Sequence, residues 1–240
     1  MAVAAPAFSG FQPEAIQFLA DLRANNDRAW FQPRKAEFER LLKEPMERLC
    51  AALEEQFRAR DIPLHADALK SPFRIYRDTR FAKDKSPYKT HYAASFGWAG
   101  DGVDAAAGRS HMESVHASGG YFHLQPGEIY VGGGVWHPEA TWLKAFRDRI
   151  AADASEFDRI VGARSFREAF GEVSDDGETL KRVPTGYPPD HPKADLLRKK
   201  NVTFGRRLSD DEAISPELPA VLADAFATAT PLMRWLATIG

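Results

Sequence analysis

One stretch in the middle of the chain decides the class of fold: YFHLQPGEIYVGGGV, at residues 121–135. Residues 121–125 and 128–135 have the pattern of two strands, and the Pro-Gly pair between them is typical of a tight turn. The stretch therefore predicts an antiparallel hairpin. Glycine costs backbone entropy inside a strand, so the run at 132–134 needs a reason. We expect a closely crossing helix there rather than a phosphate-binding loop, because no helix begins directly after it.

Further strands are predicted on both sides of this hairpin. Between residues 91 and 98 large aromatic side chains alternate with smaller ones, and the small-residue face leaves room for something to lie close against it. Shorter alternating segments at residues 73–76 and 202–204 indicate two more strands. Residues 170–173 and 179–183 flank a Ser-Asp-Asp-Gly turn, which predicts a second hairpin.

Helices are predicted at both ends of the chain. Apolar side chains recur at steps of three or four from Phe38 to Phe57 across Pro45. This spacing predicts a single helix kinked at the proline, with two abutting helices as the alternative. Other helices are expected from Pro13, from Pro138, from Ser155 through a capping box with Asp158, over residues 191–200, and after Ser215.

Helices at the ends and hairpin-linked strands in the middle predict an α+β fold. We expect a mostly antiparallel central sheet, packed on one face by the N- and C-terminal helices. Residues 1–10 are expected to form a disordered tail and residues 11–240 a single domain. Residues 99–118 are rich in Gly, Ala, Asp and Ser and show no periodicity, which predicts a loop.

The composition excludes several classes of protein. The 240 residues include 32 basic and 34 acidic side chains, a balance that argues against wholesale coating of nucleic acid. The single cysteine, Cys50, excludes an internal disulfide and a cysteine-based zinc site, and its neighbours predict a buried thiol. No apolar run approaches the roughly 20 residues that span a bilayer. Because residues 1–7 lack the features of a signal peptide, we expect a cytoplasmic protein without a membrane partner.

No cofactor and no metal are expected from the motifs. The sequence contains no dinucleotide fingerprint, no Gly-x-x-x-x-Gly-Lys loop, no paired cysteines and no His-Glu-x-x-His motif. His111 and His116 lie in the predicted loop at a spacing that no metal site demands. Ser86 has no nearby base in the sequence, so nothing indicates a catalytic triad.

The densest cluster of charge is FRIYRDTRFAKDKSPYK, at residues 73–89. Six cations stand there against two acids, Asp78 and Asp84, which cannot neutralise all of them. Arginine offers a planar fork for oxyanions and lysine a mobile point charge, so the cluster indicates an anion-binding site. The side chains expected to bind the ligand are Arg74, Arg77, Arg80, Lys83, Lys85, Tyr88 and Lys89.

Several hypotheses fit this cluster. The first is a phosphorylated or otherwise anionic small molecule as ligand, with Asp78 or Asp84 as the acid–base group if a reaction takes place. The alternative is a non-catalytic binding or scaffold protein that contacts an acidic partner or nucleic acid through the same patch. A purely structural alternative is a solvated ion-pair network that fixes a long loop. The aromatic neighbours either pack the loop or stack on a planar ligand, and we expect Phe81 to anchor it in the core.

A second basic set lies towards the C-terminus. It supports the anion site if the fold brings it against residues 74–89, and otherwise it forms a solvated helix end and edge strand. His191 would then be a donor or proton carrier, with a structural hydrogen bond as its alternative role. The set consists of Lys181, Arg182, Arg198, Lys199, Lys200, Arg206 and Arg207.

Residues 74–89 closely resemble the signature of an uncharacterised bacterial and fungal family called domain of unknown function 2461. The pattern from Phe18-Leu19 to Trp30-Phe31 is similar to the opening of that family. The Gly120-Tyr121 hairpin and residues 184–197 look like its later blocks, so the resemblance covers nearly the whole chain after the first ten residues. It implies a single-domain α+β protein with no assigned reaction.

Overall fold

The computed structural model of the protein describes residues 7–80, 82–100, 118–174 and 176–239. Within these residues, five strands form one antiparallel sheet in the order β1-β2-β3-β4-β5. The predicted hairpin is confirmed as β3 and β4, and the α+β class with an antiparallel sheet is confirmed with it. The strands are β1 Leu64–His65, β2 Tyr92–Trp98, β3 Gly119–Leu124, β4 Ile129–Val135 and β5 Val202–Leu208.

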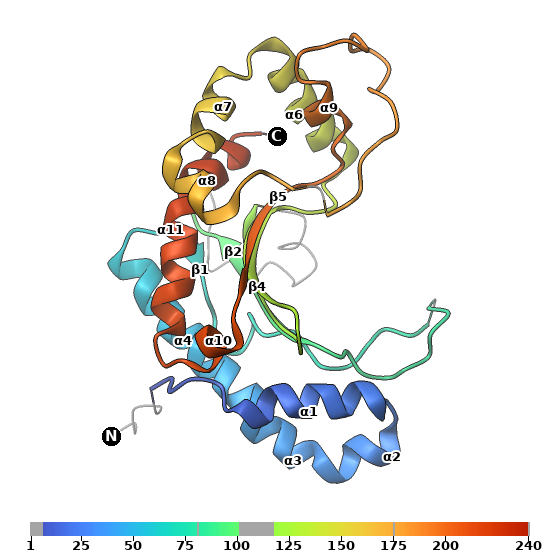
Figure 1. The fold of residues 1–240 in the computed structure, drawn as a ribbon, viewed down its shortest axis with the longest axis vertical. Helices are drawn as coiled ribbons and strands as arrows, with labels where there is room; N and C mark the ends of the chain where they lie inside the picture. Colours follow the sequence, from blue (N-terminus) through green and yellow to red (C-terminus); the bar gives the residue numbers. More distant parts are fainter. Residues whose placement is uncertain (1–6, 81, 101–117, 175, 240) are drawn as a thin grey trace.

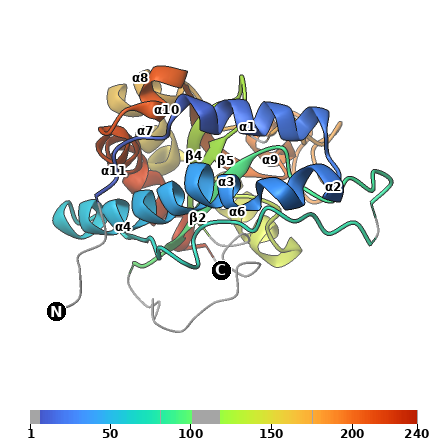
Figure 2. The same cartoon turned by 90° about the horizontal axis from the view of Figure 1, so that it is seen from below.

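The helices come before and after the strands in three groups. Figure 1 shows α4 and α11 against one face of the sheet, with α1 to α3 at one end of the molecule and α6 to α9 at the other. Seen from below, α1 lies beside α3 and α4 (Figure 2). The helices are α1 Pro13–Ala24, α2 Arg28–Phe31, α3 Lys35–Phe38, α4 Glu44–Ala59, α6 Ala140–Ala152, α7 Ser155–Val161, α8 Arg164–Phe170, α9 Ala194–Arg198, α10 Asp210–Ile214 and α11 Leu218–Ala237.

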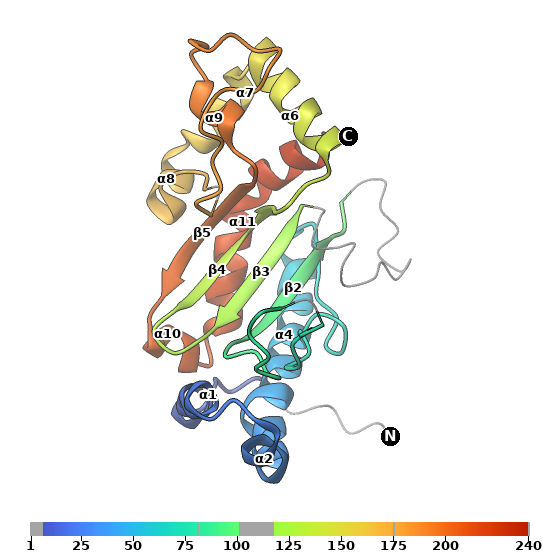
Figure 3. The same cartoon turned by 90° about the vertical axis from the view of Figure 1, so that its right-hand side faces the viewer.

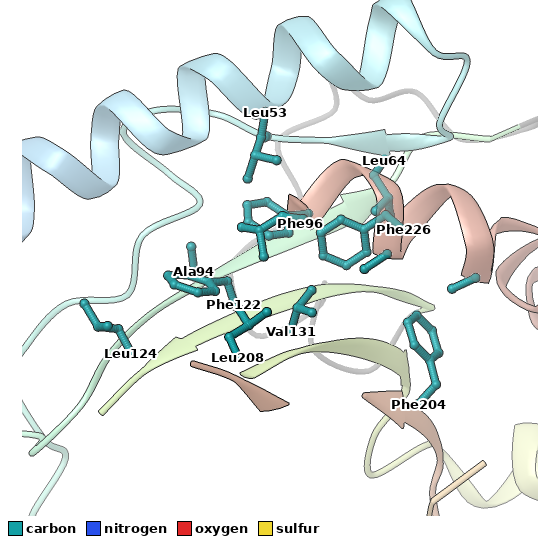
Figure 4. Close-up of a cluster of buried hydrophobic side chains, with 14 of the residues drawn as sticks. Leu53, Leu64, Ala94, Phe96, Phe122, Leu124, Val131, Phe204, Leu208 and Phe226 are labelled. Atoms are coloured by element: carbon teal, nitrogen blue, oxygen red, sulfur yellow. The ribbon is translucent and has the colours of Figure 1, made fainter. Parts of the chain in front are cut away.

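The core lies between the sheet and the helices α4 and α11 (Figure 4). Phe226 of α11 is central, with its ring centroid 5.7 Å from that of Phe57 in α4 and 5.5 Å from that of Phe96 in β2. A Cβ added to Gly120 in β3 would stand 2.7 Å from the Phe226 ring. Gly120 is therefore a glycine that lets α11 approach the sheet closely.

The glycine run at 132–134 has a different cause from the one predicted. A Cβ on Gly132 would stand 2.5 Å from the backbone oxygen of Phe204, and one on Gly134 would stand 2.2 Å from that of Val202. Gly134 also has a φ of 109°, which favours glycine. The predicted helix crossing over this run is wrong, because the close neighbour is the backbone of β5.

The long N-terminal helix continues through Pro45 as predicted. Its irregularity comes one turn earlier than expected, because residues 39–43 form a π-helical turn between α3 and α4. A proline has no backbone N–H and crowds the preceding turn, so a locally widened turn is a physical alternative to a kink.

Three local predictions were wrong. Residues 73–76 form only isolated bridges, and the predicted hairpin within 170–183 does not form because Ser174 and Thr179 pair with Thr203 and Lys199 instead. The α7 N-terminus has Ala154 rather than Ser155 at the N-cap, and a capping box is found instead at the start of α10. The first two segments satisfy their backbone groups through partners in other segments, which local patterns do not reveal, whereas Ser155 N is bound locally by the Asp153 side chain.

The N-terminal segment enters the core earlier than the sequence indicated. Phe8, assigned to the tail, is 9% exposed, and its ring centroid lies 5.6 Å from that of Phe11. Phe11 in turn stacks at 6.2 Å on Phe122 of the sheet. The order therefore extends to at least residue 7, where the described chain begins. Among the described residues, no helix is long and apolar enough to cross a membrane.

Candidate functional site

Residues 72–90 form a projecting arm between β1 and β2. Backbone hydrogen bonds join its two sides, from Arg77 N to Pro87 O at 2.9 Å and from Lys89 N to Ile75 O at 2.8 Å. Figure 1 shows the arm leaving the sheet on the side away from α11 and extending past α2. We call residues 77–86 the tip of the arm, and residues 72–76 and 87–90 its base.

Tyr88 anchors the base in the core. Its side chain is 1% exposed, and its ring stacks on Phe31 with a centroid distance of 4.1 Å. The side chain of Asn26 donates to Tyr88 O at 2.9 Å and accepts from Tyr88 N at 3.0 Å. Tyr88, which the sequence placed among the ligand-binding residues, is thus covered by its neighbours and holds the arm in position.

The tip neutralises its own arginines. Arg80 forms a forked pair with Asp78, with Nη2 at 2.6 Å from Oδ2 and Nε at 3.0 Å from Oδ1. Arg77 forms an ion pair with Asp84, whose Oδ1 also accepts from Ser86 Oγ at 2.6 Å. The side chain of Arg80 is 77% exposed, whereas that of Arg77 is 30% exposed. The tip therefore has the character of the ion-pair network that the sequence offered as the structural alternative.

The same pairs determine the state of the two acids. Hydrogen bonds from Arg80 lower the pKa of Asp78 to about 2, and those from Ser86 and Arg77 lower the pKa of Asp84 below its ordinary range. Both carboxylates are ionised and engaged at neutral pH. Their geometry gives no support to the acid–base role considered for them.

The two remaining lysines of the tip differ from its arginines. Lys85 Nζ donates to the backbone oxygen of Thr79 at 2.9 Å, so it fixes the turn. Lys83 is exposed and makes no ion pair with the described residues. Phe81, the predicted core anchor, lies outside the described residues.

Lys89 and Arg74 at the base are held differently from the tip cations. Lys89 is partly buried, and its ammonium lies 4.7 Å from the centroid of the Phe73 ring. Burial lowers the pKa of Lys89, and the positive charge of Arg74 lowers it further. In the described part of the chain, neither Lys89 nor Arg74 forms an ion pair, although Asp78 is within electrostatic reach of Arg74. The base thus concentrates positive charge that no carboxylate of the described residues contacts.

Polar rings stand beside the base on the side of the sheet away from α11. Because side chains alternate along a strand, Tyr121 and His123 point away from the face on which Phe122 is buried. The ring of His123 stacks on those of His91 at 4.5 Å and Tyr130 at 4.7 Å, and Tyr130 is directly opposite it in the register. We call His91, Tyr121, His123 and Tyr130 the ring cluster. Figure 3 shows this face of the sheet, with α11 and α4 behind it.

Hydrogen bonds within the ring cluster leave one buried atom without a partner. The hydroxyl of Tyr121 lies 3.0 Å from Nδ1 of His123 and also hydrogen-bonds with Tyr130. His123 is 7% exposed, and its Nε2 atom has no partner within hydrogen-bond distance among the described residues, although the side chain of Gln125 is close enough to interact with this imidazole. Buried polar atoms are rarely left unpaired in proteins, so this atom marks the cluster as a candidate contact for a ligand.

Burial keeps the ring cluster uncharged at neutral pH. It lowers the pKa of His91 to about 4, with smaller contributions from His123 and Lys89, and lowers the pKa of His123 to about 4. It also raises the pKa of both Tyr121 and Tyr130. The cluster therefore offers neutral hydrogen-bonding groups next to the cations of the base.

A family model described as "Conserved hypothetical protein (DUF2461)" matches residues 14–235. The chain belongs to this family. The resemblance that the sequence indicated is thus confirmed, and the DUF2461 match includes both the arm and the ring cluster. No curated protein and no solved structure matches the chain.

The second basic set is not brought against the arm. It lies on and around β5, at the opposite edge of the sheet from the arm, and several members have acidic partners of their own. Arg206 pairs with Glu212 and Arg198 with Asp195. His191 accepts from Lys193 N at 3.0 Å, which favours its structural role. His111 and His116 lie outside the described residues.

Sequence reasoning missed the ring cluster. Two features of the sequence could have indicated it. Tyr121 and His123 alternate with buried residues in β3, and the turn after β3 places Tyr130 opposite His123. These four residues come from three separate segments, so only the register of the strands reveals that they form a group. Of the predicted ligand-binding residues, the structure places Lys89 next to this group, Arg74 within electrostatic reach of Lys89, and the others in the tip or the core.

Proposed function

We propose that this DUF2461 protein is a cytoplasmic domain that binds a phosphorylated or otherwise anionic small molecule at the base of the arm. Arg74 would supply a guanidinium fork and Lys89 an ammonium group. The observation that carries the proposal is the position of Lys89. It is partly buried and near Arg74, and no carboxylate of the described residues pairs with it.

A cation in this position is electrostatically unfavourable by itself. Burial and a second positive charge both disfavour the ammonium form of Lys89, whereas a bound anion would favour it. The exposed Arg80 in the tip already has a carboxylate at 2.6 Å, so an added anion would have to displace Asp78. An anion therefore gains more at the base than at the tip.

Calorimetric titration with inorganic phosphate tests this proposal. We expect wild-type protein to bind phosphate, and Arg74→Ala and Lys89→Met each to weaken binding by about tenfold, since a hydrogen bond to a charged group contributes about 1.5–3 kcal/mol. The matched control is Arg80→Ala, which removes an arginine from the same arm and should change the affinity by less than about twofold. Circular dichroism would verify that each variant is folded.

Two results would contradict the proposal. One is the absence of phosphate binding by wild-type protein at low ionic strength. The other is an equal loss of affinity in Arg80→Ala and Lys89→Met. That result would mean that the anion binds to the arm as a whole and not specifically at its base.

The shape of the arm favours a second candidate function. Its tip projects from the molecule, Tyr76 is 45% exposed, and Lys83 and Lys85 are exposed. A projecting basic element with an exposed ring suits an acidic partner surface or a nucleic acid better than a small molecule. Binding of a nucleic acid would weaken steeply with rising salt concentration, and a flat response would exclude recognition of its phosphate backbone.

A further inference from the structure

The ring cluster adjoins the proposed anion site through Phe73. The Phe73 ring lies 4.7 Å from the Lys89 ammonium on one side and 6.0 Å, centroid to centroid, from the Tyr121 ring on the other. The charge of Lys89 also affects His91. A ligand whose anionic group lies at the base could therefore place the rest of its atoms against the ring cluster.

The rings of this cluster are stacked on one another. The planes of His123 and Tyr130 are inclined by only 16°, and those of His91 and His123 by 29°. Because these ring faces lie against each other, the cluster presents ring edges, hydroxyl groups and ring nitrogens to its surroundings. Such a surface suits groups that form hydrogen bonds, and both faces of the His123 ring are already covered, which leaves no room to stack a planar aromatic ligand on it.

The register leaves backbone, rather than side chains, next to Tyr121. Tyr121 of β3 is opposite Gly132 of β4, which is opposite Gly205 of β5. Gly205 is exposed. On the β4–β5 side of Tyr121, a bound molecule could thus approach the strand backbone without meeting a side chain in this row, whereas the neighbour on the β2 side is Ser95.

The unpartnered Nε2 of His123 points to a hydrogen bond from outside the described chain. An unsatisfied buried polar atom costs about 1–3 kcal/mol, and a ligand hydroxyl could remove this cost because it both donates and accepts. The hydroxyls of Tyr121 and Tyr130 have the same dual capacity. All of these groups are uncharged at neutral pH, which matches them to uncharged parts of a ligand.

We infer that the ligand is a phosphorylated sugar or polyol, whose hydroxyl groups are bound by Tyr121, His123 and Tyr130. This inference rests on the proposed function, because the phosphate group is assigned to Arg74 and Lys89. It adds the chemical class of the rest of the molecule, namely hydroxyl-bearing and not planar aromatic.

A panel of three probes tests the inference: inorganic phosphate, a pentose 5-phosphate and phenyl phosphate. We expect wild-type protein to bind the pentose phosphate at least about tenfold more tightly than inorganic phosphate, as one or two additional hydrogen bonds would provide. Phenyl phosphate should bind no more than about threefold more tightly than inorganic phosphate, because both faces of the His123 ring are covered by its neighbours.

Two conservative variants locate the effect. Tyr121→Phe and Tyr130→Phe each remove one oxygen atom and keep the ring, so they should fold. We expect Tyr121→Phe to remove most of the preference for the pentose phosphate while leaving the affinity for inorganic phosphate within about twofold of wild type. His123→Gln is a third variant, used only if its circular dichroism spectrum matches that of wild type.

The outcomes separate this inference from the proposed function. Equal affinity for the three probes, a preference for phenyl phosphate, or a sugar preference that survives in both tyrosine variants would overturn the inference while leaving phosphate binding in place. Pentose phosphate binding that requires Tyr121 but not Arg74 or Lys89 would support the ring cluster and overturn the proposed anion site. Binding of none of the probes would overturn both.

Discussion

The tip and the base of the arm both carry basic side chains, but these side chains differ in their electrostatic surroundings. In the tip, Arg77 and Arg80 pair with Asp84 and Asp78, and Arg80 lies largely in solvent whereas Arg77 is partly buried. At the base, Lys89 is partly buried beside Arg74 and no described carboxylate pairs with either. The density of charge in the sequence is therefore a poor guide to a binding site. What distinguishes Lys89 from the two tip arginines is that it is partly buried without a carboxylate partner in the described chain.

The largest expected effect concerns the anchoring of the base. Tyr88→Ala should lower the free energy of unfolding by about 3–5 kcal/mol, since it removes a buried ring that stacks on Phe31. The control is Tyr76→Ala, which removes a 45% exposed ring from the same arm and should cost less than half as much. Denaturant unfolding measures both. Equal losses would mean that the buried ring of Tyr88 anchors the base no better than the exposed ring of Tyr76.

As the pH falls, the ring cluster beside the base should lose stabilising free energy at a higher pH than the tip does. His91 and His123 have a pKa of about 4 in the folded protein, below the ordinary value of 6.5, so the unfolded chain binds up to about two more protons between these limits. The free energy of unfolding should therefore fall as the pH falls from 6.5 to 4. His123→Gln should make this decline shallower.

The tip carboxylates respond at lower pH. The pKa of Asp78 is lowered from 3.8 to about 2, so its stabilising contribution is present above 3.8 and is lost as the pH falls towards 2. Thermal unfolding of wild type, His123→Gln and Asp78→Asn between pH 6.5 and 2 separates the pH interval in which the histidines titrate from that in which Asp78 titrates. A wild-type stability that is constant between pH 6.5 and 5 would contradict the assignment of neutral, buried imidazoles.

Removing the tip acids should allow the tip, like the base, to bind an anion. In a Lys89→Met background, adding Asp78→Asn and Asp84→Asn should raise the affinity for phosphate by up to about fivefold, because Arg77 and Arg80 lose their exposed partners. Titration calorimetry measures this gain. No gain would mean that pairing by carboxylates is not what keeps anions from the tip.

The smallest effect is expected from breaking one exposed pair. Arg80→Ala should leave the free energy of unfolding almost unchanged, because exposed ion pairs contribute little after side-chain entropy and solvent screening. Chemical denaturation with and without added salt would measure it. A larger loss would show that the tip pairs hold the arm together.

The sequence predicted most of the sheet but little of the candidate site that lies on it. Periodicity located β2, the β3–β4 hairpin and the continuous helix across Pro45, because each depends on residues close in sequence. It failed for residues 170–183, where Ser174 pairs with Thr203 across the chain. It also failed for the glycine run, since the backbone of β5 that Gly132 approaches is about seventy residues away.

The candidate site was predicted only in part, because much of it also depends on contacts between residues distant in the sequence. Its cations were visible as a cluster, but nothing local distinguishes the paired Arg80 from Arg74, which has no ion pair in the described chain. The burial of Tyr88 depends on Phe31 and Asn26, more than fifty residues earlier. The ring cluster depends on strand register, which brings His123 and Tyr130 together only in the folded sheet.

The most direct test of the difference between base and tip is a nitrogen–proton NMR titration of wild-type protein with inorganic phosphate. One spectrum reports on both regions under the same conditions. The account predicts the largest shift changes at the amides of residues 73–75 and 88–91 and at Nε of Arg74, with the amides of residues 77–86 nearly unchanged. Largest changes in residues 77–86, or none in the arm, would contradict it.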